Sequence, residues 1–359
     1  MRLVAEILPA RGRGAWFRLA NERRFQSIGV VQELLARAAA AREENPIDAC
    51  EVTQFALYLA DRLDDSPAAF LVRGFARKEL ANTFMMRGWY DEALQQLDDA
   101  ATVYERVHAN GIEIATVILV RAVVLQRMGR ASDALPLLSE CIPVFREYGD
   151  KRLYLQARLL EGMISYSHGE FEAMHSSQHR VLLDAREAGD LEIQARLHNN
   201  LGHCCRALGR EEEAAEHFLT ASALFRELRM FTEIPRLTWA AARIRRDRGE
   251  WPAAITLFAK TRRDFMRVGL AGDADTVSLE LIELLVETGD FEEAARYARP
   301  LPKRFAERGS IDRAIEAATY VREITRHRRA TPAKIRVVRD YLRELVLQPD
   351  LVFRPPENG

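Results

Sequence analysis

The chain has 359 residues, of which 48% are hydrophobic and 29% are charged, and its formal net charge is −1 at pH 7. This near-neutral balance argues against a nucleic-acid-binding protein. No apolar run approaches the ~18 residues that a membrane span requires, and no signal peptide is visible. We therefore expect a soluble cytoplasmic protein that does not bind membranes.

Glycines recur along the chain at a nearly constant interval. The steps are 41, 40, 40, 40 and 40 residues, and the glycines are Gly88, Gly129, Gly169, Gly209, Gly249 and Gly289. A second series lies half a period away, at Gly149, Gly189, Gly269 and Gly309, with Arg229 in the remaining position. A repeat of this length is typical of solenoids, in which one elongated domain grows by adding units.

The predicted elements follow this repeat in chain order. Residues 1–26 are expected to be an N-terminal extension, and 27–66 a divergent capping hairpin with helices over 27–42 and 46–63. Six repeats follow over 67–310. Residues 311–347 predict a C-terminal capping hairpin, in which Thr331 and Pro332 suit a helix cap and first turn. Residues 348–359 predict an extended tail.

Each half-period of about 20 residues predicts one helix and one turn, because helix-forming residues dominate between the glycines and apolar residues recur every three and four positions. Glycine ends a helix readily, since it adopts the left-handed conformation without steric cost. Small residues such as Gly202 should let neighbouring helices approach closely. Pro143, Pro300 and Pro302 fall in second helices, and each is expected to kink its helix. The sequence predicts an all-α fold of antiparallel helix pairs.

These units resemble tetratricopeptide repeats (TPRs), in a variant with 40-residue units. The matching positions are the pairs Leu80-Ala81 and Leu201-Gly202, the aromatic residues Tyr90, Phe171, Trp251 and Phe291, and the alanines Ala93, Ala134, Ala214, Ala254 and Ala294. The Gly169 unit departs most, with Glu161, Met174 and Gln178 in consensus positions. The resemblance implies a right-handed α-α superhelix. Over nearly its full length the chain also resembles a group of bacterial TPR proteins from Gram-negative soil species.

In the TPR family the first helices line a concave groove that binds peptides. Counting back 13, 10, 6 and 3 residues from Gly209 and Gly249 gives the expected partner-binding residues Arg196, Asn199, His203, Arg206, Arg236, Trp239, Arg243 and Arg246. Arginine binds carboxylates in a bidentate manner and tryptophan provides an apolar anchor, while Asn199 would hold a peptide backbone. The alternative is that these arginines reflect an arginine-rich composition and that some of them pair with Glu on adjacent helices.

The same counting gives a second, largely apolar groove in the N-terminal half. Its residues are Phe75, Lys78, Asn82, Met85, Leu119, Val123, Leu159, Met163 and Tyr166. Exposed methionine and aromatic side chains often mark a peptide-binding surface, although burial between the helices is the alternative. Lys78 and Asn82 match half of the carboxylate clamp of chaperone adaptors. The other half is missing, because apolar residues occupy its positions.

No motif predicts catalysis, a cofactor or a metal, so we expect the protein not to be an enzyme. His175 and His179 are spaced to place two ligands on one helix face, but zinc needs a third ligand. The only candidates close in sequence are His168 and Glu172, and we interpret the pair as surface histidines. The four cysteines, Cys50, Cys141, Cys204 and Cys205, are expected to be buried thiols in a reducing compartment.

The function best supported by the sequence is a non-enzymatic scaffold that binds a peptide or protein partner in the concave groove, and the arginines would suit an acidic partner. The alternative is the ligand- or peptide-sensing part of a bacterial regulatory system that acts through a separate output protein. Nucleic-acid binding through the arginines ranks third, because the net charge is near zero and lysines are few. The sequence does not indicate the oligomeric state.

Overall fold

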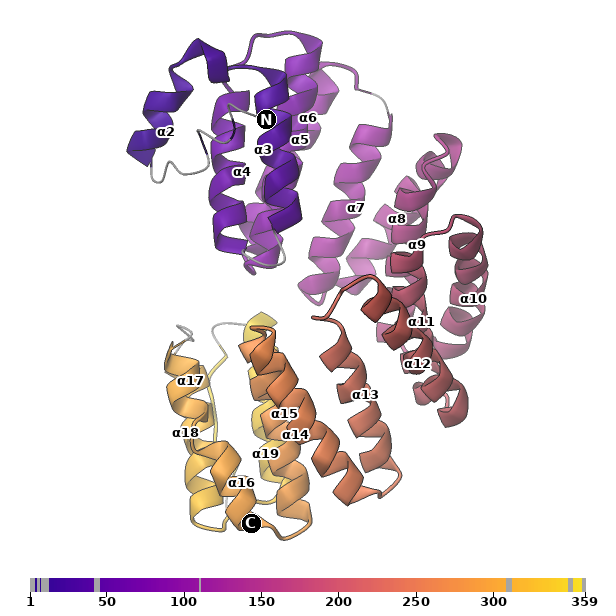
Figure 1. Ribbon diagram of the computed structural model, residues 1–359, viewed down its shortest axis with the longest axis vertical. Helices are drawn as coiled ribbons and strands as arrows, with labels where there is room; N and C mark the ends of the chain where they lie inside the picture. Colours follow the sequence, from indigo (N-terminus) through magenta and orange to yellow (C-terminus); the bar gives the residue numbers. More distant parts are fainter. Residues whose placement is uncertain are drawn as a thin grey trace. The chain divides into compact units, whose positions relative to one another are not determined.

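The structure is a computed structural model that describes residues 4, 7, 13–41, 46–109, 111–307, 312–347 and 351–356. In these ranges all regular structure is helical and no strand occurs, which confirms the predicted all-α, TPR-like fold of consecutive helix pairs (Figure 1). The chain divides into two compact units, Met1–His168 and Gly169–Gly359. Within the described ranges no helix is both long and apolar enough to cross a membrane.

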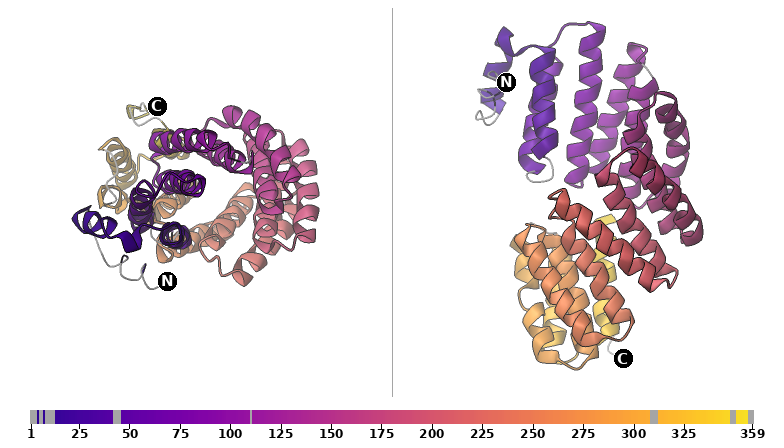
Figure 2. Two further views of the ribbon diagram at one scale, coloured as in Figure 1. Left: turned by 90° about the horizontal axis from the view of Figure 1, so that it is seen from above. Right: turned by 45° about the vertical axis from the view of Figure 1, so that its right-hand side comes forward.

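The first unit is built from antiparallel helices that pack side by side in chain order (Figure 2). Its elements are α2 (Arg13–Ala20), the short η1 (Arg23–Phe25), α3 (Ile28–Ala41), α4 (Pro46–Ala60), α5 (Pro67–Met86), α6 (Tyr90–Arg106), α7 (Gly111–Arg127), α8 (Ala131–Glu147) and α9 (Lys151–Ser167). Large side chains from successive helices fill its interior, among them the fully buried Phe55, Leu97 and Phe145. Their removal from water supplies most of the stabilisation of such a fold.

The second unit continues the same pattern. Its helices are α10 (Phe171–Glu187), α11 (Leu191–Ala207), α12 (Glu211–Glu227), α13 (Ile234–Asp247), α14 (Trp251–Arg267), α15 (Ala271–Glu287), α16 (Phe291–Ala298), α17 (Leu301–Glu307), α18 (Asp312–Arg326) and α19 (Pro332–Leu347). At Pro300, where a kink is expected, the helix is interrupted, since α16 and α17 are separate helices on either side of it. By contrast, α8 runs through Pro143 without interruption.

The repeating turns have the backbone conformation that the glycine spacing predicts. All nine glycines of the two series within the described residues have positive φ, for example +74° at Gly209. There the amide of Arg210 donates to the carbonyl of Cys205 at 2.8 Å, a hydrogen bond that closes the helix end. Arg229, which replaces a glycine, has the same conformation with φ +57°. Gly309 lies outside the described residues.

Gly202 confirms that a small residue allows close helix approach. A Cβ atom at this position would lie 2.7 Å from the ring of Phe218 on the following helix, a distance that real Cβ contacts do not show. Phe218 is itself 6% exposed and belongs to the core shared by α11, α12 and α13. The close pairing of α11 with α12 therefore depends on glycine, which has no side chain, at position 202.

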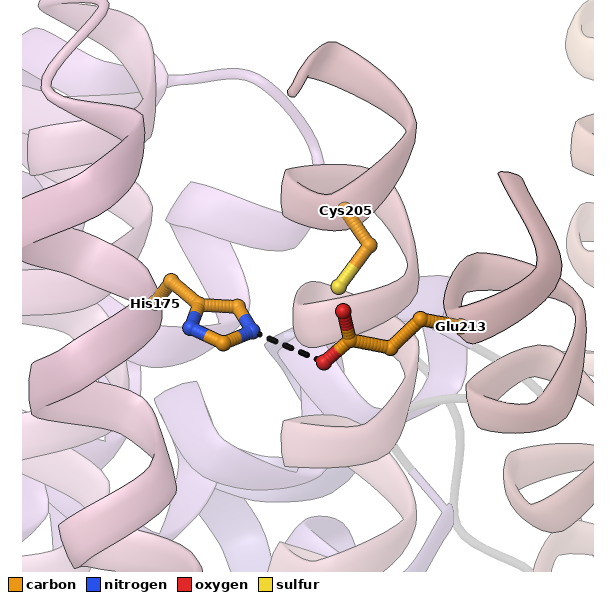
Figure 3. A group of neighbouring side chains, drawn as sticks. All are labelled: His175, Cys205 and Glu213. Atoms are coloured by element: carbon orange, nitrogen blue, oxygen red, sulfur yellow. Dashed lines mark hydrogen bonds and ion pairs between the residues drawn. The ribbon is translucent and has the colours of Figure 1, made fainter. Parts of the chain in front are cut away.

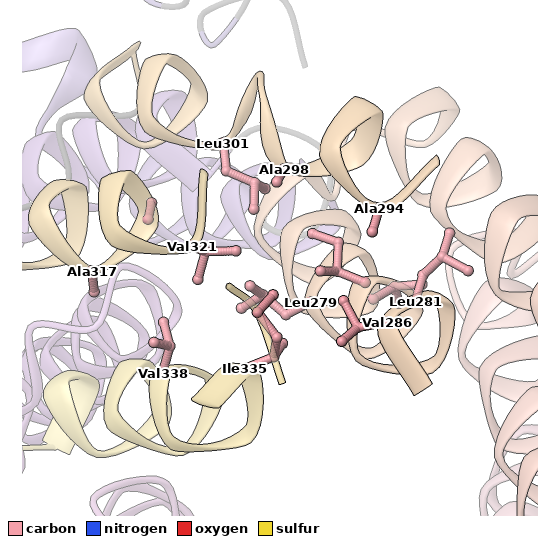
Figure 4. Packing of buried hydrophobic residues seen from close by; sticks show 14 of the residues in the cluster. Leu279, Leu281, Val286, Ala294, Ala298, Leu301, Ala317, Val321, Ile335 and Val338 are labelled. Carbon is pink, nitrogen blue, oxygen red and sulfur yellow. The ribbon is translucent and has the colours of Figure 1, made fainter. Parts of the chain in front are cut away.

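The C-terminal helices share one large apolar cluster (Figure 4). Leu279 of α15, Leu301 of α17, Val321 of α18 and Ile335 of α19 all contribute to it. The segment after α19 also belongs to the cluster through Phe353, whose ring lies 4.9 Å from that of Tyr341 and 5.7 Å from that of Tyr320. The end of the second unit is thus covered by packed side chains.

Candidate functional site

The predicted partner-binding residues of the second unit lie on the first helices of two consecutive repeats. Arg196, Asn199, His203 and Arg206 project from α11 at intervals of three and four, so they share one helix face. Arg236, Trp239, Arg243 and Arg246 repeat this spacing on α13. We refer to these eight residues as the arginine face. The two helices that carry this face are joined by the salt bridge between Arg206 of α11 and Asp247 of α13. A second salt bridge joins Arg243 of α13 to Glu280 of α15.

Arginines of this face pair with acidic residues on the first helix of the next repeat. Arg206 of α11 donates to Asp247 of α13 at 3.1 Å. Arg236 of α13 donates to Asp273 of α15, also at 3.1 Å, and to Glu233 at 3.1 Å. These ion pairs link adjacent repeats at the surface that a partner would approach.

The most buried acidic group at this surface is Glu280 of α15, which is 2% exposed. Arg243 donates two hydrogen bonds to its carboxylate, one of them 2.9 Å from Nε to Oε2. Trp239 Nε1 donates to the same oxygen at 3.2 Å, and Arg246 lies 3.6 Å from it. Burial by itself would raise the pKa of Glu280, but the hydrogen bonds and the charges of these arginines outweigh it and hold the pKa below its ordinary value.

The positive charge of the arginine face is therefore largely balanced from within the protein. The remaining arginine on α11, Arg196, pairs with Glu192 one turn earlier at 3.2 Å. Pairing with acidic residues on adjacent helices, which the sequence left as an alternative, is observed for Arg206, Arg236, Arg243 and Arg246, whereas Arg196 pairs within its own helix. Their side chains keep 25 to 45% exposure, so N–H donors are present without a large net charge.

Asn199 and Trp239 supply the polar and apolar groups of this face that an extended chain could use. The side-chain oxygen of Asn199 is buried and has no hydrogen-bond partner. The Trp239 ring packs edge-on against Phe265 with centroids 5.8 Å apart, and the Arg243 guanidinium lies 4.3 Å above it. Burial, with smaller contributions from Arg206 and Arg243, lowers the pKa of His203 to about 4, so this imidazole is neutral near pH 7.

The apolar set predicted in the first unit is only partly at the surface. Met85, Leu119 and Leu159 are buried, with 8, 6 and 9% exposure, and they pack between helices as core residues. Phe75 and Met163 are exposed at 38 and 39%. The side chains of Val123 and Tyr166 are half-buried.

Lys78 and Asn82, the two residues that match half of a carboxylate clamp, are both engaged by one neighbour. Lys78 Nζ lies 3.3 Å from the carboxylate of Glu79 and 4.5 Å from the Phe75 ring centroid. Asn82 donates to Glu79 at 3.4 Å. This acidic residue occupies the place where a peptide carboxylate would have to bind, which disfavours the clamp.

The interpretation of the pair as surface histidines is confirmed for His179, whose side chain is 42% exposed, but is wrong for His175, whose side chain is only 15% exposed. Its Nε2 lies 3.0 Å from the carboxylate of Glu213, on a helix of the next repeat. The two partners expected from proximity in sequence are engaged elsewhere. Glu172 accepts two hydrogen bonds from Arg210, and His168 contacts Ser132. The spacing of 38 residues between His175 and Glu213, close to one repeat, is the signal that could have revealed this contact.

Comparison with known proteins supports the fold. No protein-family model and no curated protein sequence matches the chain. Solved structures do match. One is a signal-transduction ATPase with numerous domains (STAND) protein with a TPR sensor from Pyrococcus horikoshii, at TM-score 0.63 and 14% identity over 96% of this chain and 53% of that one. The chain thus spans about half the length of the STAND protein.

Two further structures are similar. Aspartyl phosphate phosphatase F from Bacillus subtilis matches at TM-score 0.54 and 13% identity, over 85% of this chain and 79% of that one. The Rap conjugation gene regulator of the plasmid pLS20, solved in complex with the Phr* peptide, matches at TM-score 0.53 and 12% identity, over 83% of this chain and 96% of that one. At these identities the similarity shows a common TPR-like fold.

Proposed function

We propose that this protein is a non-enzymatic interaction scaffold that binds an extended peptide segment of a partner on the arginine face of α11 and α13. The observation that carries the proposal is the buried, unpartnered side-chain oxygen of Asn199. A buried acceptor without a partner has an energetic cost, and a peptide N–H would remove this cost once the Asn199 amide turns outward on binding. Repeat proteins of this kind present rows of side chains on successive units to such a segment.

Each group on the face has a role in this proposal. Asn199 accepts a hydrogen bond from the peptide backbone. Trp239, fixed by Glu280 and Arg243, offers the ring against which an apolar side chain packs. The arginines donate through N–H groups that their acidic partners leave free. Because those partners balance the charge, the bound segment need not be acidic.

A narrower form of the proposal is a sensing role. The similar STAND protein is described as having a TPR sensor, and the similar Rap regulator was solved with a bound peptide. In this form the peptide would alter the second unit, and a separate output protein would respond. The binding face is the same in both forms.

The test begins with selection of binding peptides from a random displayed library against the full chain. A selected peptide is then titrated by fluorescence anisotropy into wild type, Asn199→Ala, Trp239→Ala and Leu219→Ala. Leu219 is 72% exposed on the second helix α12 and serves as the control. We expect the first two variants to weaken binding at least about tenfold, with the control unchanged. Equal affinity for all four proteins would contradict the proposal.

The same assay separates nucleic-acid binding from peptide binding. Nucleic-acid affinity would fall steeply between low and high salt, because binding releases counterions. A face whose charges are internally balanced should show little salt dependence with the selected peptide. Tight binding of a random single-stranded oligonucleotide, lost at high salt, would favour the nucleic-acid alternative.

A further inference from the structure

Three consecutive helices of the second unit, α10, α11 and α12, bring metal-binding side chain types to one place. They are His175 and His179 on α10, His198 and Cys205 on α11, and Glu213 and His217 on α12. Neighbouring imidazoles lie in contact, with ring centroids 4.5 Å apart for His175 and His179 and 5.6 Å apart for His179 and His217. Helical folds build metal centres from donors on facing helices in this way.

One triad within this cluster has the dimensions of a metal site. The ligand atoms of His175, Cys205 and Glu213 all lie within 4.8 Å of one another, and His175 Nε2 is 3.0 Å from Glu213 Oε1. Figure 3 shows the imidazole and the thiol approaching the same carboxylate from two different helices. Tetrahedral zinc places nitrogen and oxygen ligands about 3.3 Å apart and sulfur slightly further. The three ligand atoms would therefore need only a small shift to surround an ion.

A second triad shares the same carboxylate. The ligand atoms of His179, Glu213 and His217 also lie within 4.8 Å of one another. Behind them, His217 Nδ1 is 2.9 Å from Nδ1 of His198. One of these two rings must donate to the other, which orients His217 and keeps its Nε2 for another contact. The cluster therefore has ordered supporting groups as well as donors.

We propose that His175, Cys205 and Glu213 bind a zinc-class transition-metal ion, with His179 and His217 as the adjoining donors. Nitrogen, thiolate sulfur and carboxylate oxygen are the ligand types that zinc prefers. Binding releases the thiol proton of Cys205 to solvent, so that Zn²⁺, thiolate and carboxylate together carry no net charge in this mostly buried position. A surface pocket lined by Glu213, by 209–212 and by Arg248 lies beside this carboxylate.

The metal would join three helices that belong to two repeats. His175 is on the second helix of the Gly169 repeat, whereas Cys205 and Glu213 flank the turn at Gly209. The Gly169 repeat is the one whose consensus positions are most altered. A bound ion would therefore stabilise the interface of α10 with α11 and α12 by linkage, in proportion to its affinity.

Isothermal titration of the untagged, metal-free full chain with Zn²⁺ tests this site. We expect one equivalent of Zn²⁺ to bind and Mg²⁺, the control ion, not to bind. Cys205→Ser and Glu213→Gln should each weaken binding at least about tenfold. Cys204→Ser is the matched control, because Cys204 is the adjacent buried cysteine and its Sγ lies 3.0 Å from the carbonyl of Phe171 instead. Circular dichroism checks that each variant is folded.

Co²⁺ provides a second readout that identifies the ligands directly. Wild type and Cys204→Ser should show the thiolate-to-cobalt charge-transfer absorption in the near ultraviolet, and Cys205→Ser should lack it. Zn²⁺ should also raise the thermal unfolding midpoint of wild type and Cys204→Ser but not of Glu213→Gln. If Cys205→Ser fails to fold, Glu213→Gln still tests the site.

Two results would overturn the proposal. If wild type binds no Zn²⁺, or if binding is the same in Cys205→Ser and Glu213→Gln as in wild type, the cluster is not a metal site. If binding survives Cys205→Ser, without a thiolate band, and is lost in His217→Gln, the assigned ligand set is wrong and the His179, Glu213 and His217 triad replaces it.

Discussion

Arg243 on α13 binds the buried carboxylate of Glu280 on α15 with two hydrogen bonds, and so joins the first helices of two successive repeats. The pair is asymmetric, because the Glu280 side chain is 2% exposed and that of Arg243 is 25% exposed. Glu280 is therefore the member that needs its partner in order to remain ionised when buried. The arginine face, which we propose as the binding face, and the stability of the unit share this interaction.

Replacing Glu280 by glutamine should destabilise the protein by about 2–3 kcal/mol, since Arg243 loses its charged partner while Trp239 keeps an acceptor. Denaturant unfolding followed by circular dichroism measures the change. Glu192→Gln, which removes the partner of Arg196 at a pair about one-third exposed, should cost less than about 0.5 kcal/mol. Similar losses for the two variants would show that Glu280 has no special role.

The contribution of Glu280 should also depend on pH with a defined sign. Its folded-state pKa lies below the ordinary value of 4.5, so the unfolded chain takes up a proton first as the pH falls. The stabilisation is complete above pH 4.5 and is lost as the pH falls below it. The stability difference between wild type and Glu280→Gln should therefore shrink between pH 5 and pH 3. A constant difference over this interval would contradict the assignment.

Arg229 occupies a turn position that glycine fills at the other described members of the two glycine series, and His108 and Arg328 are the other non-glycine residues with positive φ among the described residues. Arg229 is exposed and has φ +57°, a conformation that costs a non-glycine residue about 1 kcal/mol. Arg229→Gly should raise the free energy of unfolding by about 0.5–1 kcal/mol, and Gly209→Ala, at φ +74°, should lower it by a similar amount. A loss of stability in Arg229→Gly, or a gain in Gly209→Ala, would rule out backbone strain as the reason.

Gly202→Ala should destabilise the second unit by about 1–3 kcal/mol, because the new methyl group would meet the Phe218 ring at 2.7 Å. Gly29→Ala is the control, since a Cβ at this helical position meets no atom within 4 Å. The control should be neutral or slightly stabilising. Unfolding curves of both variants test this, and a loss in the control alone would be inconsistent with the packing described above.

The fold was predictable from sequence because its information is local and repeated. The glycine series predicted the turns, and the structure gives each described member a positive φ. Arg229 adopts the same conformation although its residue type does not favour it, because the hydrogen bond from Met230 to Phe225 at 2.8 Å closes the helix end as in the other turns. Repetition thus identified a position that composition alone would have missed.

The side-chain partners were less predictable, because they connect positions about one repeat apart. Counting from the turn glycine placed Arg243 and Trp239 on their helix face, but nothing in that count indicated that Glu280 would occupy both. His175 was assigned to the surface for the same reason. Its partner Glu213 lies one repeat further along the chain, beyond the window in which metal-ligand spacing is usually sought.

Photo-cross-linking would show whether a partner segment binds on α11 and α13, as we propose. A selected peptide carrying a benzophenone is irradiated with the full chain, and the adducts are located by mass spectrometry. We expect adducts in the segments 196–206 and 236–246, which Asn199→Ala and Trp239→Ala should reduce. Adducts confined to the second helices α12 and α14 would contradict the proposal.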